Sequence, residues 1–248
     1  MAGGYGNIDG KFSNIQTQFV RNILKKVYPP LPILNIISKQ DLAFIKKHLF
    51  DSARNKVLNV GSGNHAGVGY RLWIGENTKN VLNFDIEKGL NVDVVGDAHS
   101  LPFEENIFDS IIMQAVIEHL HTPTVAISEA FRVLKHGGHL YLEVPFLQGF
   151  HGDPHDYQRY TINGLKKLIE KYGDVILVGV SSGPFSFLVW WIRDFVSNLT
   201  KVKKLNLVIR FIISWLIFPM KYLDLLFRKT DSTERLACEY FILIRAKK

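Results

Sequence analysis

The sequence has little cysteine and no sign of an export signal. Cys238 is the only cysteine among 248 residues, so no disulfide can form within the chain. Residues 1–7 have neither the basic start nor the apolar run of a signal peptide. We therefore expect a cytoplasmic protein in a reducing compartment.

A complete dinucleotide-binding fingerprint is also missing. Gly61 and Gly63 form a G-x-G pair, but Gly67 and Gly69 fall one position off the third glycine of G-x-G-x-x-G. The segment after the fourth predicted strand lacks the Asn/Asp-Pro-Pro-Tyr-like motif of many enzymes that modify nucleic-acid bases. These absences disfavour a dinucleotide cofactor and a nucleic-acid substrate.

The formal charge of +7 is compatible with a nucleic acid, an anionic membrane or an acidic substrate as partner. Many of the basic residues alternate with Leu, Ile, Phe and Trp, rather than with the Gly, Ser and Asn expected of a nucleic-acid-binding arm. They are Lys201, Lys203, Lys204, Arg210, Lys221, Arg228, Lys229 and those from 245 to 248. This distribution favours a membrane surface over nucleic acid.

What the sequence does contain is a short apolar strand that runs into a glycine turn. Val57, Leu58 and Val60 precede Gly61 and Gly63, whose missing side chains let a ligand approach the backbone. A lone G-x-G is more often an ordinary turn.

Two later runs make the pattern more specific. The apolar run 81–84 is followed by Asp85, about 20 residues after the glycines, where a carboxylate can bind ribose hydroxyls. Residues 92–95 end in Gly96-Asp97-Ala98. The order predicts a site for an adenosine-bearing ligand at the carboxyl edge of a parallel sheet.

At these motifs the chain resembles the class I S-adenosylmethionine-dependent methyltransferases, in the broad small-molecule branch often called type 11. The resembling segments are 57–64, 83–85, 96–103, 108–111, 117–120 and 129–138, about half of the chain. One departure is Asn59, where members of the family usually have an acidic residue. The asparagine keeps a carbonyl acceptor but loses a charge that would favour the cationic cofactor.

The resemblance implies S-adenosylmethionine as cofactor and assigns a role to each matching residue. Gly61 and Gly63 would face its methionine part with Gln114 beside them, and Asp85 would bind the ribose. Asp97 and Ala98 would contact the adenine. The full set that we expect to bind cofactor is Asn59, Gly61, Gly63, Asp85, Ile86, Asp97, Ala98 and Gln114.

The expected fold is α/β, a Rossmann-like doubly wound sheet of seven strands that is mostly parallel with the last strand antiparallel. We expect strands near 57–60, 81–85, 92–95, 108–113, 140–144, 175–180 and 238–245, and helices at 38–49, 122–134 and from Thr161. An amphipathic helix is expected between Ser13 and Val27. Residues 1–50 would form an N-terminal helical cover, and 51–183 with 236–248 the cofactor-binding domain.

Residues 184–235 stand where the family usually has a short connection, and we expect an apolar helical insertion between strands six and seven. The run 205–218 has no polar face, so it must be buried in protein, in a partner or in lipid. Three interpretations stay open: an anionic membrane surface contacted by residues 184–232, a lid over a lipidic or bulky substrate, and a homodimer contact.

Candidate catalytic groups follow the fifth strand, in the segment 151–161. His151 or His155 could act as the base with Asp156 orienting its ring. Asp156 could instead pair with Arg159 in an ordinary loop. A divalent metal held by His151, Asp153 and His155 is the third alternative, but the spacing is not a recognised metal signature and we assign no metal. His119, after the fourth strand, is the fourth candidate catalytic residue.

We therefore predict an S-adenosylmethionine-dependent methyltransferase. Its acceptor would be a small molecule, most simply a hydroxyl of a sugar or glycolipid, because the 151–161 loop resembles one in family members linked to glycans. The expected place of action is the inner face of a membrane. Two alternatives stay open: methylation of a lipid-soluble acceptor such as a quinone or polyketide, and a catalytically silent binding module.

Overall fold

The structure is a computed structural model that describes residues 30–51, 55–63, 80–151 and 155–247. The predicted helix between Ser13 and Val27, and residues Asp153 and Gly67, lie outside the described residues. Our division of the chain into a cover, a cofactor-binding domain and an insertion stays a prediction.

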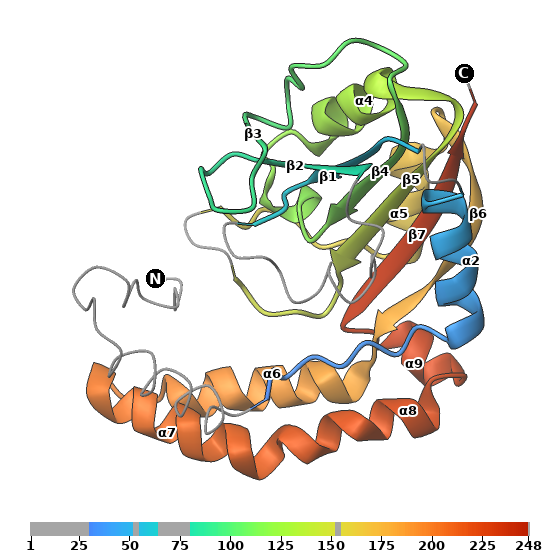
Figure 1. The fold of residues 1–248 in the computed structure, drawn as a ribbon. Coiled ribbons are helices and arrows are strands. Elements are labelled where there is room, and N and C mark those ends of the chain that lie inside the picture. Colours follow the sequence, from blue (N-terminus) through green and yellow to red (C-terminus); the bar gives the residue numbers. More distant parts are fainter. Residues whose placement is uncertain (1–29, 52–54, 64–79, 152–154, 248) are drawn as a thin grey trace.

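The described residues contain one seven-stranded sheet with the strand order β3-β2-β1-β4-β5-β7-β6 (Figure 1). The strands are β1 Val57–Val60, β2 Val81–Asp85, β3 Val94–Val95, β4 Phe108–Gln114, β5 Leu134–Pro145, β6 Gly173–Ser182 and β7 Glu239–Ala246. The pairings from β3 to β5 are parallel, and β7 runs antiparallel to both of its neighbours. The predicted fold class is confirmed.

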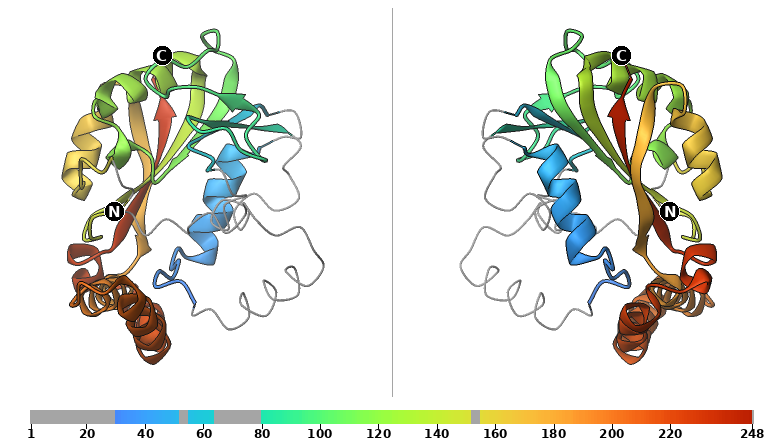
Figure 2. Two further views of the ribbon diagram at one scale, coloured as in Figure 1. Left: turned by 90° about the vertical axis from the view of Figure 1, so that its left-hand side faces the viewer. Right: turned by 90° about the vertical axis from the view of Figure 1, so that its right-hand side faces the viewer.

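Helices cover both faces of the sheet (Figure 2). On one face lie α4 Pro123–Val133 and α5 Ile162–Ile169, which bury Ile127, Phe131 and Leu165 in the larger core. On the other face lies α2 Lys39–Leu49, whose Ile45 and Leu49 pack in a second core with Tyr141 and Phe241. Central strand β1 is buried at all four positions, as expected for a parallel strand covered on both faces.

Local signals in the sequence place several element ends correctly. The Ser38 side chain accepts a hydrogen bond from Asp41 N–H at the start of α2, and Thr161 accepts one from Gly164 N–H at the start of α5. Three predicted strands differ by two or more residues at an end, and β6 is the one that does so at both ends, where it extends to Gly173–Ser182. β3 is reduced to Val94–Val95, and β5 begins at Leu134 because the chain continues into the sheet through Gly137, which has a φ of +71°, instead of ending a helix there.

Between β6 and β7 the chain forms a helical layer, which confirms the predicted insertion of helices at this point. It consists of α6 Pro184–Ser197, α7 Lys203–Ile217, a 3-10 turn η4 Phe218–Tyr222, α8 Leu223–Phe227 and α9 Asp231–Arg235. Figure 1 shows α6 and α7 side by side beyond the carboxyl ends of β4 and β5. The insertion therefore lies on the edge of the sheet where ligands bind in this class of fold.

The outer side of this helical layer is apolar and exposed. Large side chains that are at least one third exposed include Trp191, Phe195, Leu207, Val208, Phe211, Ile212, Trp215, Leu216 and Leu226. Among the described residues, one helical stretch, Lys203–Phe227, is long and apolar enough to cross a membrane by length and composition, and only 11% of its apolar window is buried. This property alone is weak support for a membrane span.

Asp224 ties the far end of the insertion to its beginning. Its fully buried carboxylate accepts hydrogen bonds from Phe185 N–H at 2.9 Å, Ser186 N–H at 2.9 Å and the Ser186 hydroxyl at 2.7 Å. These donors lie in the first turn of α6, where backbone N–H groups have no partner within the helix. The carboxylate therefore caps α6 and holds α8 against it.

The segment before α2 ties the insertion to the edge of the sheet. Ile36 N–H donates to Ser181 O at 2.8 Å, and Leu34 N–H donates to the Ser186 hydroxyl at 3.0 Å. Lys221 of η4 is buried and donates to Leu31 O at 2.6 Å, and burial lowers its pKa. The helical layer is thus held by the sheet edge and by the segment 31–36.

We expect Asp224→Ala to lower the free energy of unfolding by about 2–4 kcal/mol, because it leaves buried N–H and O–H donors without an acceptor. Chemical denaturation of the full chain measures this change. The control is Asp174→Ala, which removes an exposed ion pair with Lys247 and should cost at most about 0.5 kcal/mol. Equal stability of the two variants would contradict the capping role of Asp224.

Candidate active site

The glycine turn after β1 is held against the end of β2. Gly61 and Gly63 have φ of +72° and +74°, a region that favours glycine. Gly61 N–H and Ser62 N–H both donate to Phe84 O, at 2.8 and 3.1 Å. A Cβ on Gly61 would lie 2.3 Å from Val116 Cγ2, so the turn also packs closely on the segment after β4.

Asp85 lies directly against this turn. One oxygen of its partly buried carboxylate accepts from Gly63 N–H at 2.8 Å and the other from Glu87 N–H at 2.9 Å. A carboxylate has about four acceptor positions, so Asp85 can bind further donors such as ribose hydroxyls. The neighbouring Ile86 side chain is 70% exposed and offers an apolar surface beside it.

Asp97 and Ala98 follow β3, which pairs with β2 at Asp85 and Val95. Gly96 N–H donates to Asp85 O at 2.9 Å, so the two predicted carboxylates belong to adjacent strand ends. Asp97 is exposed and accepts from the backbone N–H and the ring of His99, and these hydrogen bonds, led by the backbone one, hold the pKa of Asp97 below its usual value. Ala98 is buried beneath them.

Asn59, the departure from the family pattern, is used within the sheet. It is buried, and its Nδ2 donates to the side-chain oxygen of Asn83 at 3.0 Å across the β1–β2 pair. An aspartate here could not donate this bond and could only accept one if the Asn83 amide were turned over. The amide therefore has a structural partner on β2.

Gln114, at the end of β4, is held by a residue that sequence reasoning missed. Its Nε2 donates to Glu143 on β5 at 2.7 Å, and the buried Tyr141 hydroxyl donates to the same carboxylate at 3.0 Å. Burial raises the pKa of Glu143. A glutamate within the otherwise apolar run of β5 was the signal in the sequence.

Glu118 and two histidines meet beyond the ends of β4 and β5. Glu118 and His119 belong to a 3-10 turn, η3 Ile117–His119, and His151 follows β5. The Nε2 atoms of both histidines lie 3.8 Å from Glu118 Oε1. Burial opposes protonation of His151, but Glu118, the Gly149 carbonyl and Asp156 outweigh it, so that the pKa of His151 is raised.

The other predicted catalytic residues are placed differently. Asp156 binds Arg159 through both of its oxygens and accepts from His151 N–H at 2.7 Å, but its carboxylate is 3.7 Å from the His151 ring. It positions the loop backbone and makes no hydrogen bond to the imidazole. His155 is exposed, with its ring beside the Tyr157 hydroxyl, and its carbonyl accepts from His119 Nδ1.

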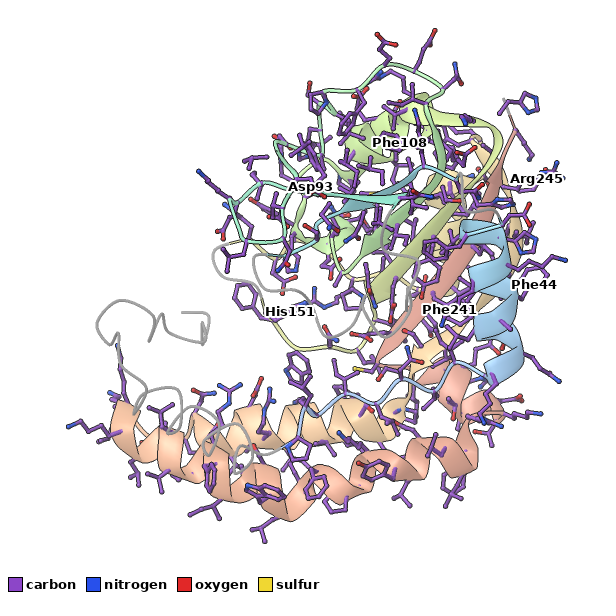
Figure 3. The ribbon with its side chains drawn as sticks, viewed as in Figure 1. Phe44, Asp93, Phe108, His151, Phe241 and Arg245 are labelled. Atoms are coloured by element: carbon purple, nitrogen blue, oxygen red, sulfur yellow. The ribbon has the colours of Figure 1, made fainter. Side chains whose placement is uncertain are left out.

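The insertion reaches this cluster through Trp190 of α6. The ring of Trp190 lies 5.8 Å from that of His151, which in turn lies 5.1 Å from that of His119. Figure 3 shows His151 on the side of the sheet that faces α6. Two hollows of the described surface lie away from this cluster, one of them beside His139 and Asp109 at the opposite end of β4.

Comparison with known families identifies the central part of the chain. Residues 58–142 match the family described as "Methyltransferase domain". This segment contains the glycine turn, Asp85, Asp97, Gln114 and the Glu118 turn. This segment has the signature of the class I S-adenosylmethionine-dependent methyltransferases of type 11, and S-adenosylmethionine is the methyl donor of that family.

Individual relatives are distant. An uncharacterised protein of Methanocaldococcus jannaschii is 27% identical over 125 residues, 50% of this chain and 60% of the relative. A ubiquinone/menaquinone biosynthesis C-methyltransferase, UbiE, of Allorhizobium ampelinum is 32% identical over 130 residues, 46% of either chain. The chain thus spans about half the length of the curated relatives it matches.

Solved structures show the fold alone. The crystal structure of the [4+2]-cyclase SpnF aligns with a TM-score of 0.56 over 93% of both chains, at 14% identity.

We expect Gly61→Ala to lower the free energy of unfolding by about 1–3 kcal/mol, because alanine must adopt a strained φ and its Cβ meets Val116. Gly149→Ala is the matched control, since a Cβ there meets nothing within 4 Å. Denaturant midpoints of the two variants test the difference. A Gly61→Ala midpoint equal to that of Gly149→Ala would contradict the close packing of the turn.

Proposed function

We propose that the protein transfers a methyl group from S-adenosylmethionine to a small-molecule acceptor. The observation that carries the proposal is the convergence of the glycine turn, Asp85 and the end of β3 on one stretch of the sheet edge. Exposed backbone at Gly61 permits a close ligand, and the Asp85 carboxylate has acceptor capacity to spare. The proposed cofactor residues are the eight predicted from the sequence.

The acceptor side would be the Glu118–His119–His151 cluster. Methyl transfer is an in-line displacement at a carbon with a good leaving group, so the protein mainly aligns and desolvates the reactants. A hydroxyl acceptor must also lose a proton, and a hydroxylated aromatic ring that is methylated on carbon reacts more readily once its hydroxyl is deprotonated. A buried carboxylate with two imidazoles at contact distance suits either task.

Two observations favour a lipid-soluble acceptor such as a quinone or polyketide. The UbiE relatives, which are named for ubiquinone and menaquinone biosynthesis, match this chain at 32–35% identity over 112–130 residues. The apolar helical layer lies against the cluster through Trp190 and offers a hydrophobic approach to it. The hydroxyl of a sugar or glycolipid is the second candidate, which the acid–base character of the cluster supports.

The fold by itself does not decide the chemistry, because a protein named as a [4+2]-cyclase shares it. A cofactor-binding experiment must therefore distinguish an enzyme from a catalytically silent module.

We expect the purified chain to bind S-adenosylmethionine in calorimetry and Asp85→Ala to weaken this binding about 10- to 100-fold, the value of one or two hydrogen bonds to a charged group. Asp174→Ala, on an exposed site at the start of β6, should bind like the wild type. Thermal melts confirm that both variants fold.

Methyl-labelled cofactor then tests the acceptor class. Transfer to a short-chain quinol but not to simple sugars would support the lipid-soluble acceptor. Transfer to sugars but not to the quinol would favour a sugar or glycolipid hydroxyl as acceptor. Absence of cofactor binding by the wild type would overturn the proposal and leave a silent module.

We further propose that the helical layer rests on an anionic membrane at the cytoplasmic face. Its exposed apolar residues, among them Trp191, Phe211 and Trp215, are accompanied by Lys203 and Lys204 at the start of α7. Apolar burial and attraction to anionic lipid together hold such helices at a bilayer surface. A homodimer formed through the same face is the alternative.

We expect the chain to pellet with vesicles that contain anionic lipid and to be partly released by high salt. The double variant Phe211→Ser/Leu216→Ser, at exposed positions of α7, should stay in the supernatant with an unchanged melting temperature. Pelleting of this variant to the wild-type extent would show that the layer is not the anchor. A wild-type dimer that dissociates in the same variant would favour the dimer contact.

A further inference from the structure

Glu118 is a buried carboxylate without a hydrogen-bond partner. The residue is 0% exposed, and neither of its side-chain oxygens has a partner within hydrogen-bond distance among the residues that the structure describes. Burial of a charged carboxylate costs on the order of several kcal/mol unless the group is paired or coordinates a metal. Within the described residues its nearest charge partners are two histidine rings at 3.8 Å, beyond hydrogen-bond distance, so both carboxylate oxygens are open to a ligand.

The two histidines beside Glu118 direct the same ring atom towards it. His119 Nδ1 is 2.6 Å from the His155 carbonyl oxygen, and His151 Nδ1 is 3.1 Å from the Gly149 carbonyl oxygen. A carbonyl can only accept, so each Nδ1 carries a proton, and each Nε2 is the atom that a metal ion would bind in place of a proton. Such bonds to backbone carbonyls are how metal-binding histidines are usually oriented.

Arg159 does not change this assignment. Its Nη2 lies 3.3 Å from His151 Nδ1, but the guanidinium donates at shorter distances to the Asp156 carboxylate and to the Gly149 carbonyl. These two acceptors satisfy it, and the Gly149 carbonyl is closer to the histidine ring than Arg159 is.

We propose that Glu118, His119 and His151 bind one divalent first-row transition-metal ion. Their ligand atoms all lie within 4.8 Å of one another, and both Nε2 atoms are 3.8 Å from the same carboxylate oxygen. Ligands bound at about 2.0–2.2 Å stand roughly 3.0–3.4 Å apart, so pairs of ligand atoms must close by about 0.5–1.5 Å to complete the site. Two imidazoles and one carboxylate leave coordination positions open and suit Zn²⁺, Fe²⁺, Co²⁺ or Mn²⁺.

This site differs from the one considered from sequence, which used His151 with Asp153 and His155. Glu118 and His119 come from the turn after β4 and His151 from the loop after β5, so adjacent strands bring the ligands together. The open positions would take an oxygen of the acceptor and lower its pKa, a role that rests on the proposed function. Binding of the ion itself does not depend on that function.

The test uses the full-length chain after treatment with a chelator, titrated with Co²⁺ and followed by visible absorption. We expect one Co²⁺ per chain, bound at least about 10-fold more weakly by His119→Ala and His151→Ala, because each variant lacks a direct ligand. Glu118→Gln has the same shape without the charge and should weaken binding in the same way. His136→Ala is the matched control, because His136 is exposed on the far part of β5 and should bind Co²⁺ like the wild type.

X-ray absorption of the wild-type Co²⁺ complex covers the case in which a variant does not fold, and it should show two imidazole ligands. Absence of imidazole ligation, absence of binding, or equal binding by the wild type and folded variants would overturn the proposal. S-adenosylmethionine binding is measured on the same metal-free protein. Cofactor binding without Co²⁺ binding would contradict the metal site alone. Co²⁺ binding without cofactor binding would contradict the proposed function alone.

Discussion

The hydrogen bond from Gly63 N–H to the Asp85 carboxylate joins the two strand ends on which the proposed cofactor site depends. It fixes a turn with two positive-φ glycines against the end of β2, and Gly61 and Ser62 add two bonds to Phe84 O. The turn is thereby preorganised, so a ligand that enters would not have to order the backbone itself. Asp97 lies near the same strand end, because β3 pairs with β2 at Asp85 and Asp97 follows β3.

A second constraint acts at the ends of β4 and β5, where polar groups are buried in an apolar surrounding. Glu143 has its partners in Gln114 and Tyr141, and these bonds hold the end of β4 against β5. Glu118 lacks any comparable partner within the described protein, although it is buried as completely. The difference separates a structural carboxylate from one that we assign to a ligand.

The helical layer has an exposed apolar surface and also contacts the Glu118–His119–His151 cluster. Asp224 and Lys221 hold it through buried polar contacts, while its outer side chains remain exposed. A surface of this kind on a layer that touches the cluster through Trp190 would link a hydrophobic environment to the proposed acceptor side. It is the feature that most separates this chain from a minimal fold of its class.

The sequence by itself determined most of the elements and predicted the cofactor side, because those signals are local. Apolar runs, the glycines at 61 and 63, the caps at Ser38 and Thr161 and the acids that end two strands each act within a few residues. Only the tertiary structure decided which polar groups share a site. Glu118 and His151 are 33 positions apart, and Asp156 lies nearer to His151 in sequence yet pairs with Arg159. Parallel strand pairing, which no local pattern encodes, brings the ends of β4 and β5 together and so places Glu118 beside His151.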